Sequence, residues 1–194
     1  MQGLGCRPLM NPPQIIFLNG TSSAGKSSLA KALQANLSEP YLHFCIDAFE
    51  EMMPNRPDFE WLPIFTKTLS GMHHSIVAMA DCGNRLIVDH VLVEGEAPLE
   101  WVPECLRLLA RFDILFVGVQ CPLPILRVRE TTRKDRKPGM AEWQSTRMHL
   151  KMQYDVDVNT AALSPQDCAL QVIDAFKIPR TGWNATLSSY GLRK

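Results

Sequence analysis

The sequence has no long hydrophobic run and no excess of charge of either sign. No apolar stretch approaches the roughly 20 residues that cross a bilayer as a helix, so we expect no membrane partner. The 20 Lys and Arg residues balance 20 Asp and Glu residues, which removes the usual electrostatic basis for binding nucleic acid. The first 14 residues lack a basic segment followed by an apolar one, so we expect no secretion signal.

Paired cysteines are also lacking, because none of the six forms a CxxC pair or another zinc-ligand spacing. Several lie in apolar runs, where a thiol behaves as a small hydrophobic group. Together with the lack of an export signal, this favours reduced cysteines and a cytoplasmic location. The cysteines are Cys6, Cys45, Cys82, Cys105, Cys121 and Cys168.

The 194 residues contain 46% hydrophobic and 21% charged residues, which is ordinary for a soluble globular chain. This length is enough for one domain with a full core. We expect the domain to span residues 14–179. Residues 1–13 and 180–194 are predicted to be loose tails because of their Pro, Gly and Ser content.

Apolar runs alternate with helical patterns through this domain. Strands are predicted over residues 14–19, 41–46, 85–93 and 112–119, with a weaker one over 154–158. Helices are predicted over residues 26–37, 61–82, 98–109, 122–134, 141–152 and 164–176. Such alternation predicts an α/β fold, with a mostly parallel sheet covered by helices on both faces.

The segment GTSSAGKS after the first predicted strand satisfies the pattern G-x-x-x-x-G-K-[ST]. Gly20 and Gly25 permit backbone angles that let successive N–H groups point at phosphate oxygens. Lys26 can reach the β and γ phosphates, and the Ser27 hydroxyl can ligate Mg²⁺. The alternative is a chance match in a connector, but the strand before it and the helix after it favour a phosphate site. The predicted nucleotide-binding residues are Gly20, Thr21, Ser22, Ser23, Ala24, Gly25, Lys26, Ser27 and Ser28.

Ligands of open α/β sheets bind at the carboxyl ends of the strands, so polar residues there are candidates. Asp89 closes the third predicted strand, in the Walker B-like position of a Mg²⁺ ligand. A strand-end turn residue is the alternative. For the neighbouring His90 two interpretations stay open, contact with an acceptor or packing against the sheet. A GTPase is disfavoured, because the nearest match to NKxD, residues 55–58, lacks the Lys.

Asp47 follows the second predicted strand and has two interpretations. Its carboxylate could take the proton of an attacking hydroxyl group. With Glu50 three residues later, it also fits a capping box that opens a helix. Spacing alone favours the cap, because capping is the commoner role.

The segment RETTRKDRKPGM places Arg129, Arg133 and Arg136 on one helical face. A lid that brings guanidinium groups onto a transferred phosphate needs such a face, whereas a solvated basic face is the alternative. The Pro-Gly break directly after these arginines favours a lid over about residues 127–140.

Several motifs together resemble one family in their order. The segments are FLNGTSSAGKSSLAKALQ, HFCIDAFEEMMP, LIVDHVL, FVGVQCP, RETTRKDRKPGM and YDVDVNT. Over roughly residues 15–176 the chain resembles the chloramphenicol phosphotransferase-like family. The resemblance implies a three-layer P-loop kinase fold with a five-stranded parallel sheet, similar to nucleotide and shikimate kinases. It also implies phosphoryl transfer from ATP to a hydroxyl group of chloramphenicol, an antibiotic-resistance activity.

The roles that this resemblance implies fall on matching motif positions. They are phosphate binding by Lys26, metal binding by Ser27, base catalysis by Asp47, and lid contacts by Arg133 and Arg136. Two departures concern the acceptor pocket, since the antibiotic-modifying member has a second Asp where this chain has His90, and residues 54–61 form a shorter stretch here. Phosphoryl transfer is therefore a firmer expectation than chloramphenicol as the acceptor.

The leading hypothesis from the sequence is an ATP- and Mg²⁺-dependent phosphotransferase with an alcohol group of a small molecule as acceptor. A nucleotide-sugar or nucleoside kinase is one alternative. A nucleotide-binding regulatory protein without transfer activity is another, although such a switch needs no acceptor base. The sequence leaves the identity of the acceptor, the choice between ATP and GTP, and the oligomeric state open.

Overall fold

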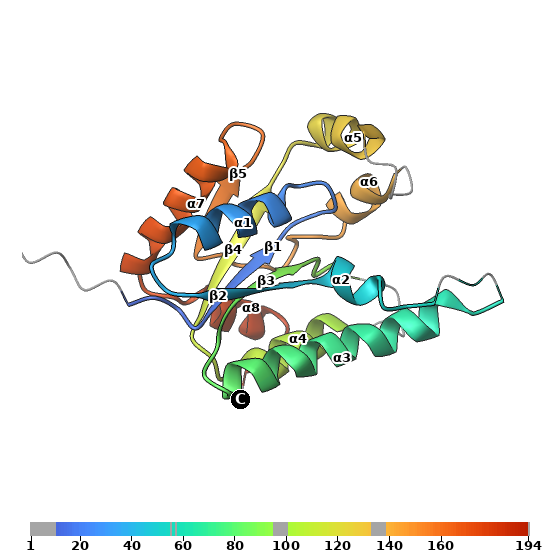
Figure 1. The fold of residues 1–194 in the computed structure, drawn as a ribbon, viewed down its shortest axis with the longest axis horizontal. Coiled ribbons are helices and arrows are strands. Elements are labelled where there is room, and N and C mark those ends of the chain that lie inside the picture. Colours follow the sequence, from blue (N-terminus) through green and yellow to red (C-terminus); the bar gives the residue numbers. More distant parts are fainter. Residues whose placement is uncertain (1–10, 55, 57, 95–100, 133–138, 194) are drawn as a thin grey trace, which may run out of the picture.

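The computed structural model describes residues 11–54, 56, 58–94, 101–132 and 139–193. Its centre is a five-stranded sheet in the order β2-β3-β1-β4-β5, and every pairing is parallel (Figure 1). The predicted five-stranded parallel sheet is therefore confirmed. The strands are Ile15–Asn19 (β1), Tyr41–Cys45 (β2), Arg85–His90 (β3), Ile114–Gln120 (β4) and Val156–Asn159 (β5).

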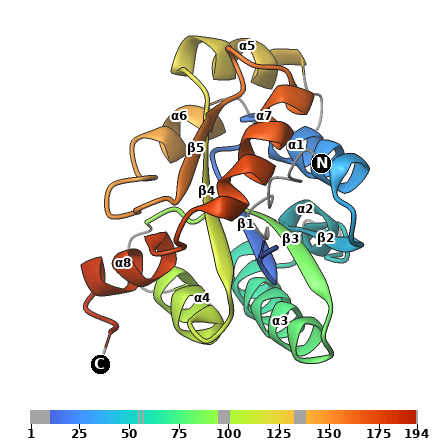
Figure 2. The ribbon, with the colours of Figure 1, turned by 90° about the vertical axis from the view of Figure 1, so that its left-hand side faces the viewer.

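Helices cover both faces of this sheet. Helices α1 and α7 pack on one face, and α3, α4 and α8 pack on the other (Figures 1 and 2). Helices α2, α5 and α6 lie at the end of the sheet where the strands finish (Figure 1). The helices are Lys26–Asn36 (α1), Ile46–Glu50 (α2), Trp61–Asp81 (α3), Trp101–Leu109 (α4), Leu123–Thr132 (α5), Met140–Ser145 (α6), Pro165–Asp174 (α7) and Gly182–Ser189 (α8), with a 3₁₀ turn at Ala175–Lys177.

The central strands form where the chain is apolar on both faces, as expected for strands buried inside a parallel sheet. In β1, Ile15 and Phe17 point into the cluster under α3, α4 and α8. The alternate residues Ile16 and Leu18 point into the cluster under α1 and α7. All four side chains are fully buried. This packing holds β1, and with it the start of the loop that follows, in place.

The prediction of a loose C-terminal tail over residues 180–194 is wrong for its described part. Trp183 and Leu187 of α8 are buried in the core, and the Trp183 ring lies 4.9 Å from that of Phe17. The start of α8 is anchored by Asp155, whose Oδ1 accepts hydrogen bonds from the N–H groups of Thr181 and Gly182. The sequence of α8 is mostly small and polar, and a few large side chains supply nearly all of its packing, so its composition did not predict a buried helix.

Other boundaries differ by a few residues from the prediction. The largest difference is α6, which ends at Ser145 and does not continue to residue 152. At its end the hydroxyl groups of Ser145 and Thr146 donate to carbonyl oxygens three residues earlier, a local alternative to further helical turns. Among the described residues, no helix is long and apolar enough to cross a membrane. Residues 1–10 are not described, so the N-terminal tail stays a prediction.

Candidate active site

The glycine-rich loop between β1 and α1 has the backbone that a phosphate cradle needs. Gly25, directly before α1, has a φ of 93°, which is in the left-handed region. Gly20 needs its small size for another reason, because a Cβ atom there would lie 2.6 Å from the carbonyl oxygen of Val119. The loop residues Thr21, Ser22 and Ser23 are buried between β1 and α1. Both glycines of the motif are therefore required by the observed turn.

One backbone N–H group of the loop donates to a side-chain oxygen, and other polar groups of the loop have no such partner in the described part of the chain. The Ser22 N–H donates to Oε1 of Gln144, in α6, at 2.6 Å. Among the described residues, the buried hydroxyl oxygens of Ser22 and Ser23 have no hydrogen-bond partner. Lys26 Nζ donates to the carbonyl oxygen of Thr21 at 3.0 Å. An anion bound at this loop would supply acceptors to donors that are costly to leave unsatisfied.

The two predicted metal ligands lie side by side, since β1 and β3 are neighbouring strands. Ser27 Oγ donates to Asp89 Oδ2 at 2.6 Å, and Lys26 Nζ lies 3.6 Å from Asp89 Oδ1. Burial alone would raise the pKa of Asp89, but the charge of Lys26, the nearby His43 ring and the hydrogen bond from Ser27 lower it. The net result is a pKa of about 2, so the carboxylate is ionised near neutral pH. A hydroxyl and a carboxylate oxygen are ligands that suit Mg²⁺.

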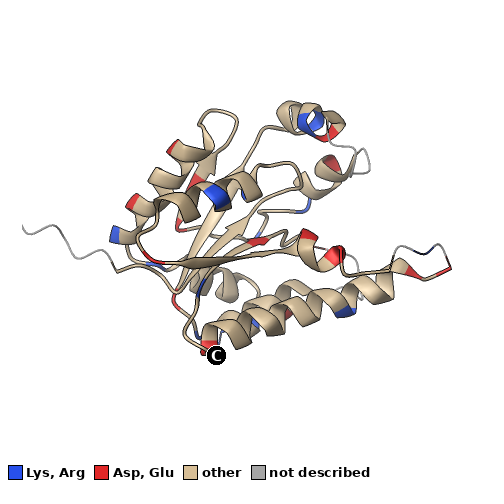
Figure 3. Ribbon diagram, viewed as in Figure 1, with Lys and Arg blue, Asp and Glu red and all other residues tan. Residues whose placement is uncertain are grey.

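Asp47 lies in the first turn of α2 and does not cap it. The strand ends at Cys45, which is the N-cap residue of α2 and makes no side-chain capping hydrogen bond. The capping-box interpretation is therefore wrong, and Asp47 does not end the strand. The helix starts at Ile46, two residues before the start that an Asp47 cap would give, and both Phe44 and Ile46 pack against the core. The acidic positions of α2 are marked in Figure 3, and Asp47 and Glu50 both line the cavity described next.

A cavity of about 850 Å³ joins the phosphate loop to an apolar wall. Lys26, Ser27 and Asp89 line its polar part. The apolar wall includes the stacked rings of Trp61 and Phe65, whose centroids are 4.4 Å apart. Other apolar side chains of the wall are Leu62, Leu69, Val93, Trp101 and Trp143. One cavity can therefore hold a phosphate group and a largely apolar body together.

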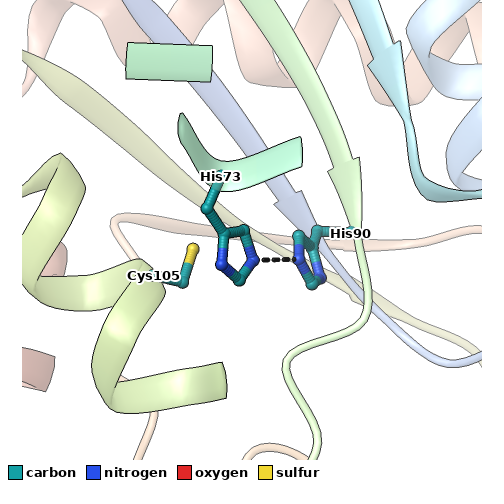
Figure 4. Close-up of side chains that lie close together, drawn as sticks. All are labelled: His73, His90 and Cys105. Atoms are coloured by element: carbon teal, nitrogen blue, oxygen red, sulfur yellow. Dashed lines mark hydrogen bonds between the residues drawn. The ribbon is translucent and has the colours of Figure 1, made fainter. Parts of the chain in front are cut away.

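His90 lies in a buried hydrogen-bonded chain behind this cavity. Its Nδ1 accepts from the Val91 N–H at 2.6 Å, and its Nε2 lies 2.9 Å from Nε2 of His73 (Figure 4). Nδ1 of His73 lies 3.0 Å from a carboxylate oxygen of Glu104. Burial lowers the pKa of both imidazoles, so each is neutral, with His90 donating to His73 and His73 to Glu104. The structure thus supports the packed interpretation of His90.

The predicted lid arginines Arg133 and Arg136 lie outside the described residues. The first arginine of that face, Arg129, contacts the outside of the phosphate loop. Its Nη2 donates to the carbonyl oxygen of Thr160 at 2.7 Å, and its Nη1 lies 3.4 Å from the carbonyl oxygen of Ala24. Arg129 therefore supports the loop from its carbonyl side.

Sequence reasoning missed Gln144 and Glu130. Glu130 accepts hydrogen bonds from the N–H groups of Gly139 and Ala141, which fixes the start of α6. This anchoring places Gln144 against the phosphate loop, 122 residues away in the chain. The Gln144 contact had no local sequence signal, because it depends on how distant segments pack. Glu130 lies within the RETTRKDRKPGM motif, which does not by itself reveal its hydrogen bonds.

Comparison with known proteins agrees with this geometry. The model of the family described as chloramphenicol phosphotransferase-like protein matches residues 13–177. The chain belongs to this family. It is also 28% identical over 189 residues to the "Putative O-phosphotransferase" of two strains of Mycobacterium tuberculosis, with 84% of this chain and 82% of the relative covered.

Two solved structures that share this fold are an adenosine phosphosulfate (APS) kinase and a shikimate kinase. The APS kinase of Mycobacterium tuberculosis, in complex with AMPPNP and APS, superposes with a TM-score of 0.64 at 18% identity, covering 86% of this chain and 100% of that one. Shikimate kinase of Acinetobacter baumannii gives 0.59 at 16% identity, covering 88% and 97%. The fold is therefore that of P-loop kinases. With the family, it makes this protein a phosphotransferase that acts on a hydroxyl group of a small molecule.

Proposed function

We propose that the protein transfers the γ-phosphoryl group of ATP, with Mg²⁺, to a hydroxyl group of a small molecule with an apolar body. A chloramphenicol-like antibiotic or a related compound is the proposed acceptor, and inactivating it would confer resistance. The observation that carries this proposal is the single cavity lined both by the phosphate loop and by stacked aromatic side chains. As an ATP-consuming enzyme, it would act in the cytoplasm.

The phosphate loop fits the triphosphate of ATP. Its buried Ser22 and Ser23 hydroxyl groups lack partners among the described residues, and Gln144 shows that a Ser22 N–H can bind an acceptor oxygen there. Lys26 would leave the Thr21 carbonyl to contact the transferred phosphate. The APS kinase of the same fold is in complex with AMPPNP, which supports a nucleotide as a ligand of this protein.

Ser27 and Asp89 fit Mg²⁺, because their oxygens are adjacent and the carboxylate is ionised. When bound, Mg²⁺ would neutralise phosphate charge. Asp47 is the proposed base, since a carboxylate in the same cavity can accept the proton of the attacking hydroxyl group. We propose lid contacts with the transferred phosphate for Arg133 and Arg136, on the family motif alone.

The apolar wall supports an acceptor with a hydrophobic body. Trp61 and Phe65 stack, and Phe65 meets Trp101 edge-on with ring centroids 6.0 Å apart. Trp61 is 56% exposed although it is large and apolar. Burying such a surface under a ligand is favourable at roughly 25 cal/mol per Å². A bare sugar would gain little there.

The test is phosphoryl transfer from labelled ATP to a panel of alcohols, read by mass spectrometry of the products. The panel includes chloramphenicol, other apolar alcohols, sugars and nucleosides. We expect phosphorylated products from apolar-bodied alcohols with the wild-type protein and none with Lys26→Ala. Transfer confined to sugars or nucleosides would contradict the proposed acceptor, and ATP hydrolysis without any acceptor product would contradict the transferase.

A further inference from the structure

A second set of ligand atoms surrounds Asp89, on the edge of the sheet formed by β2. Cys45 is paired directly with Asp89 across the β2–β3 register. Side chains alternate along a strand, so His43 and Cys45 share the face on which Tyr41 packs under α1, opposite Phe44. A nitrogen, a sulfur and an oxygen ligand therefore meet on one side of the sheet.

The distances among these atoms match those around one metal ion. His43 Nε2 lies 3.6 Å from Asp89 Oδ2, and Cys45 Sγ lies 3.8 Å from the same oxygen. All three ligand atoms are within 4.8 Å of one another. Ligands bonded tetrahedrally to Zn²⁺ are about 3.3–3.6 Å apart, given its usual bond lengths. The two distances to Asp89 Oδ2 are within a few tenths of an ångström of these values. His43 Nε2 and Cys45 Sγ lie within 4.8 Å of each other, and a bound ion would draw them closer.

An independent observation concerns the His43 ring. Its Nε2 is buried and has no hydrogen-bond partner within the described part of the chain. Asp89 Oδ2, 3.6 Å away, is within ion-pair distance but beyond hydrogen-bond distance. A buried polar atom without a partner is costly. This nitrogen is directed at the carboxylate oxygen that Cys45 also approaches, so a cation between them would satisfy it.

We propose that His43, Cys45 and Asp89 bind a soft divalent cation, Zn²⁺ being the best match. Zn²⁺ accepts nitrogen, sulfur and oxygen ligands in tetrahedral geometry, whereas Mg²⁺ demands oxygen ligands in an octahedron. The fourth ligand is Ser27 Oγ, 2.6 Å from Asp89 Oδ2, or water. Binding converts the Cys45 thiol to a thiolate and releases one proton to solvent.

Asp89 and Ser27 also make up the proposed Mg²⁺ site, so Zn²⁺ bound here competes with Mg²⁺ for them. Zn²⁺ bound here therefore inhibits phosphoryl transfer, a consequence that rests on the proposed function. The binding itself does not rest on it, since it requires neither nucleotide nor acceptor.

A second cluster, His73, His90 and Cys105, also brings three ligand atoms within 4.8 Å (Figure 4). There the Val91 N–H donates to His90 Nδ1, which leaves the ring proton on Nε2 facing His73. Both imidazoles are thus satisfied by hydrogen bonds, and a metal would have to displace them. This cluster provides an internal control for the proposed site.

The experiment titrates the nucleotide-free protein with Co²⁺, a spectroscopic substitute for Zn²⁺, and then displaces it with Zn²⁺. We expect a thiolate-to-cobalt charge-transfer band that saturates at one ion per chain and disappears on adding Zn²⁺. Cys45→Ser should abolish the band, and His43→Gln should weaken Zn²⁺ binding at least about 10-fold, the lower limit for losing even a supporting group. The matched controls Cys82→Ser and Cys105→Ala should behave like wild type.

A missing band in the wild-type protein would overturn the site, as would a band that survives Cys45→Ser and is lost in Cys105→Ala. His43→Gln leaves every cysteine in place and tests the site independently if Cys45→Ser fails to fold. Inhibition is measured separately, as transfer with increasing Zn²⁺ at fixed Mg²⁺, and Cys45→Ser should be resistant. Because the band is recorded without ATP, its failure is distinguishable from failure of the transferase activity.

Discussion

Replacing Asp47 by Asn separates the proposed base from a structural role more cleanly than any other change in this chain. The substitution keeps the size of the side chain and removes its negative charge. Asp47 is the second residue of α2, and Cys45, not Asp47, is its N-cap residue. Losing one charge near a helix N-terminus costs about 0.3–1 kcal/mol. For a domain of this size, such a loss lowers Tm by at most about 4 °C.

The catalytic cost is expected to be much larger. General base catalysis contributes roughly 10²- to 10⁴-fold to a rate, so kcat for acceptor phosphorylation should fall by about that factor. The KM for ATP should change little, because Asp47 is not part of the phosphate loop. The assay measures product formation by mass spectrometry and Tm by thermal denaturation on the same preparation.

Glu50→Gln is the matched control for Asp47→Asn. Glu50 is on the same helix, also lines the cavity and undergoes the same change of charge. We expect a loss of kcat of no more than a few-fold in that variant. Equal losses of kcat in both variants would mean that Asp47 contributes only negative charge to the cavity, as Glu50 does, and is not the base. An Asp47→Asn protein with wild-type turnover would refute the base assignment.

Three further predictions concern the lid, the buried carboxylate and the C-terminal helix. Loss of a lid arginine, in Arg133→Ala or Arg136→Ala, should lower kcat more than it raises the KM for ATP, because lid arginines stabilise charge that peaks in the transition state. An effect on KM alone would mean that these arginines bind the nucleotide in the ground state. The Asp89 pKa is depressed from 3.8 to about 2, so its carboxylate contributes about 2 kcal/mol of stability above pH 4, lost as pH falls towards 2. Urea denaturation of wild type should therefore show more loss of stability between pH 5 and about pH 3 than Asp89→Asn does, and identical slopes would contradict this. Trp183→Ala should cost about 3–5 kcal/mol, and an unchanged Tm would show that α8 is not part of the core.

Much of the fold was predictable from local sequence. The strands β1, β3 and β4 are apolar on both faces, and the loop that follows β1 has a motif whose glycines the backbone requires. Helix α8 was not predictable, because Trp183 and Leu187 are separated by small and polar residues. Its stability depends on contacts with distant strands, which no local pattern records.

The candidate site also contains residues that the sequence predicted and contacts that it did not. Lys26, Ser27 and Asp89 were identified from the motif and from strand ends, and the structure brings them together. The helix-capping prediction for Asp47 failed because the packing of Ile46 starts the helix earlier. The approach of Cys45 to Asp89 depends on strand register over 44 residues, which spacing along the chain does not reveal.

The central claim is that one cavity holds ATP and an alcohol so that the phosphoryl group passes from one to the other without being released to water. The most direct measurement uses ATP whose γ-phosphoryl oxygens carry ¹⁸O, with chloramphenicol and other apolar alcohols as acceptors. Direct transfer predicts a phosphorylated acceptor that retains all the non-bridging label on a phosphorus joined to unlabelled acceptor oxygen, and Lys26→Ala should yield none. Label found only in free phosphate, with no labelled acceptor for any alcohol tested, would contradict the account.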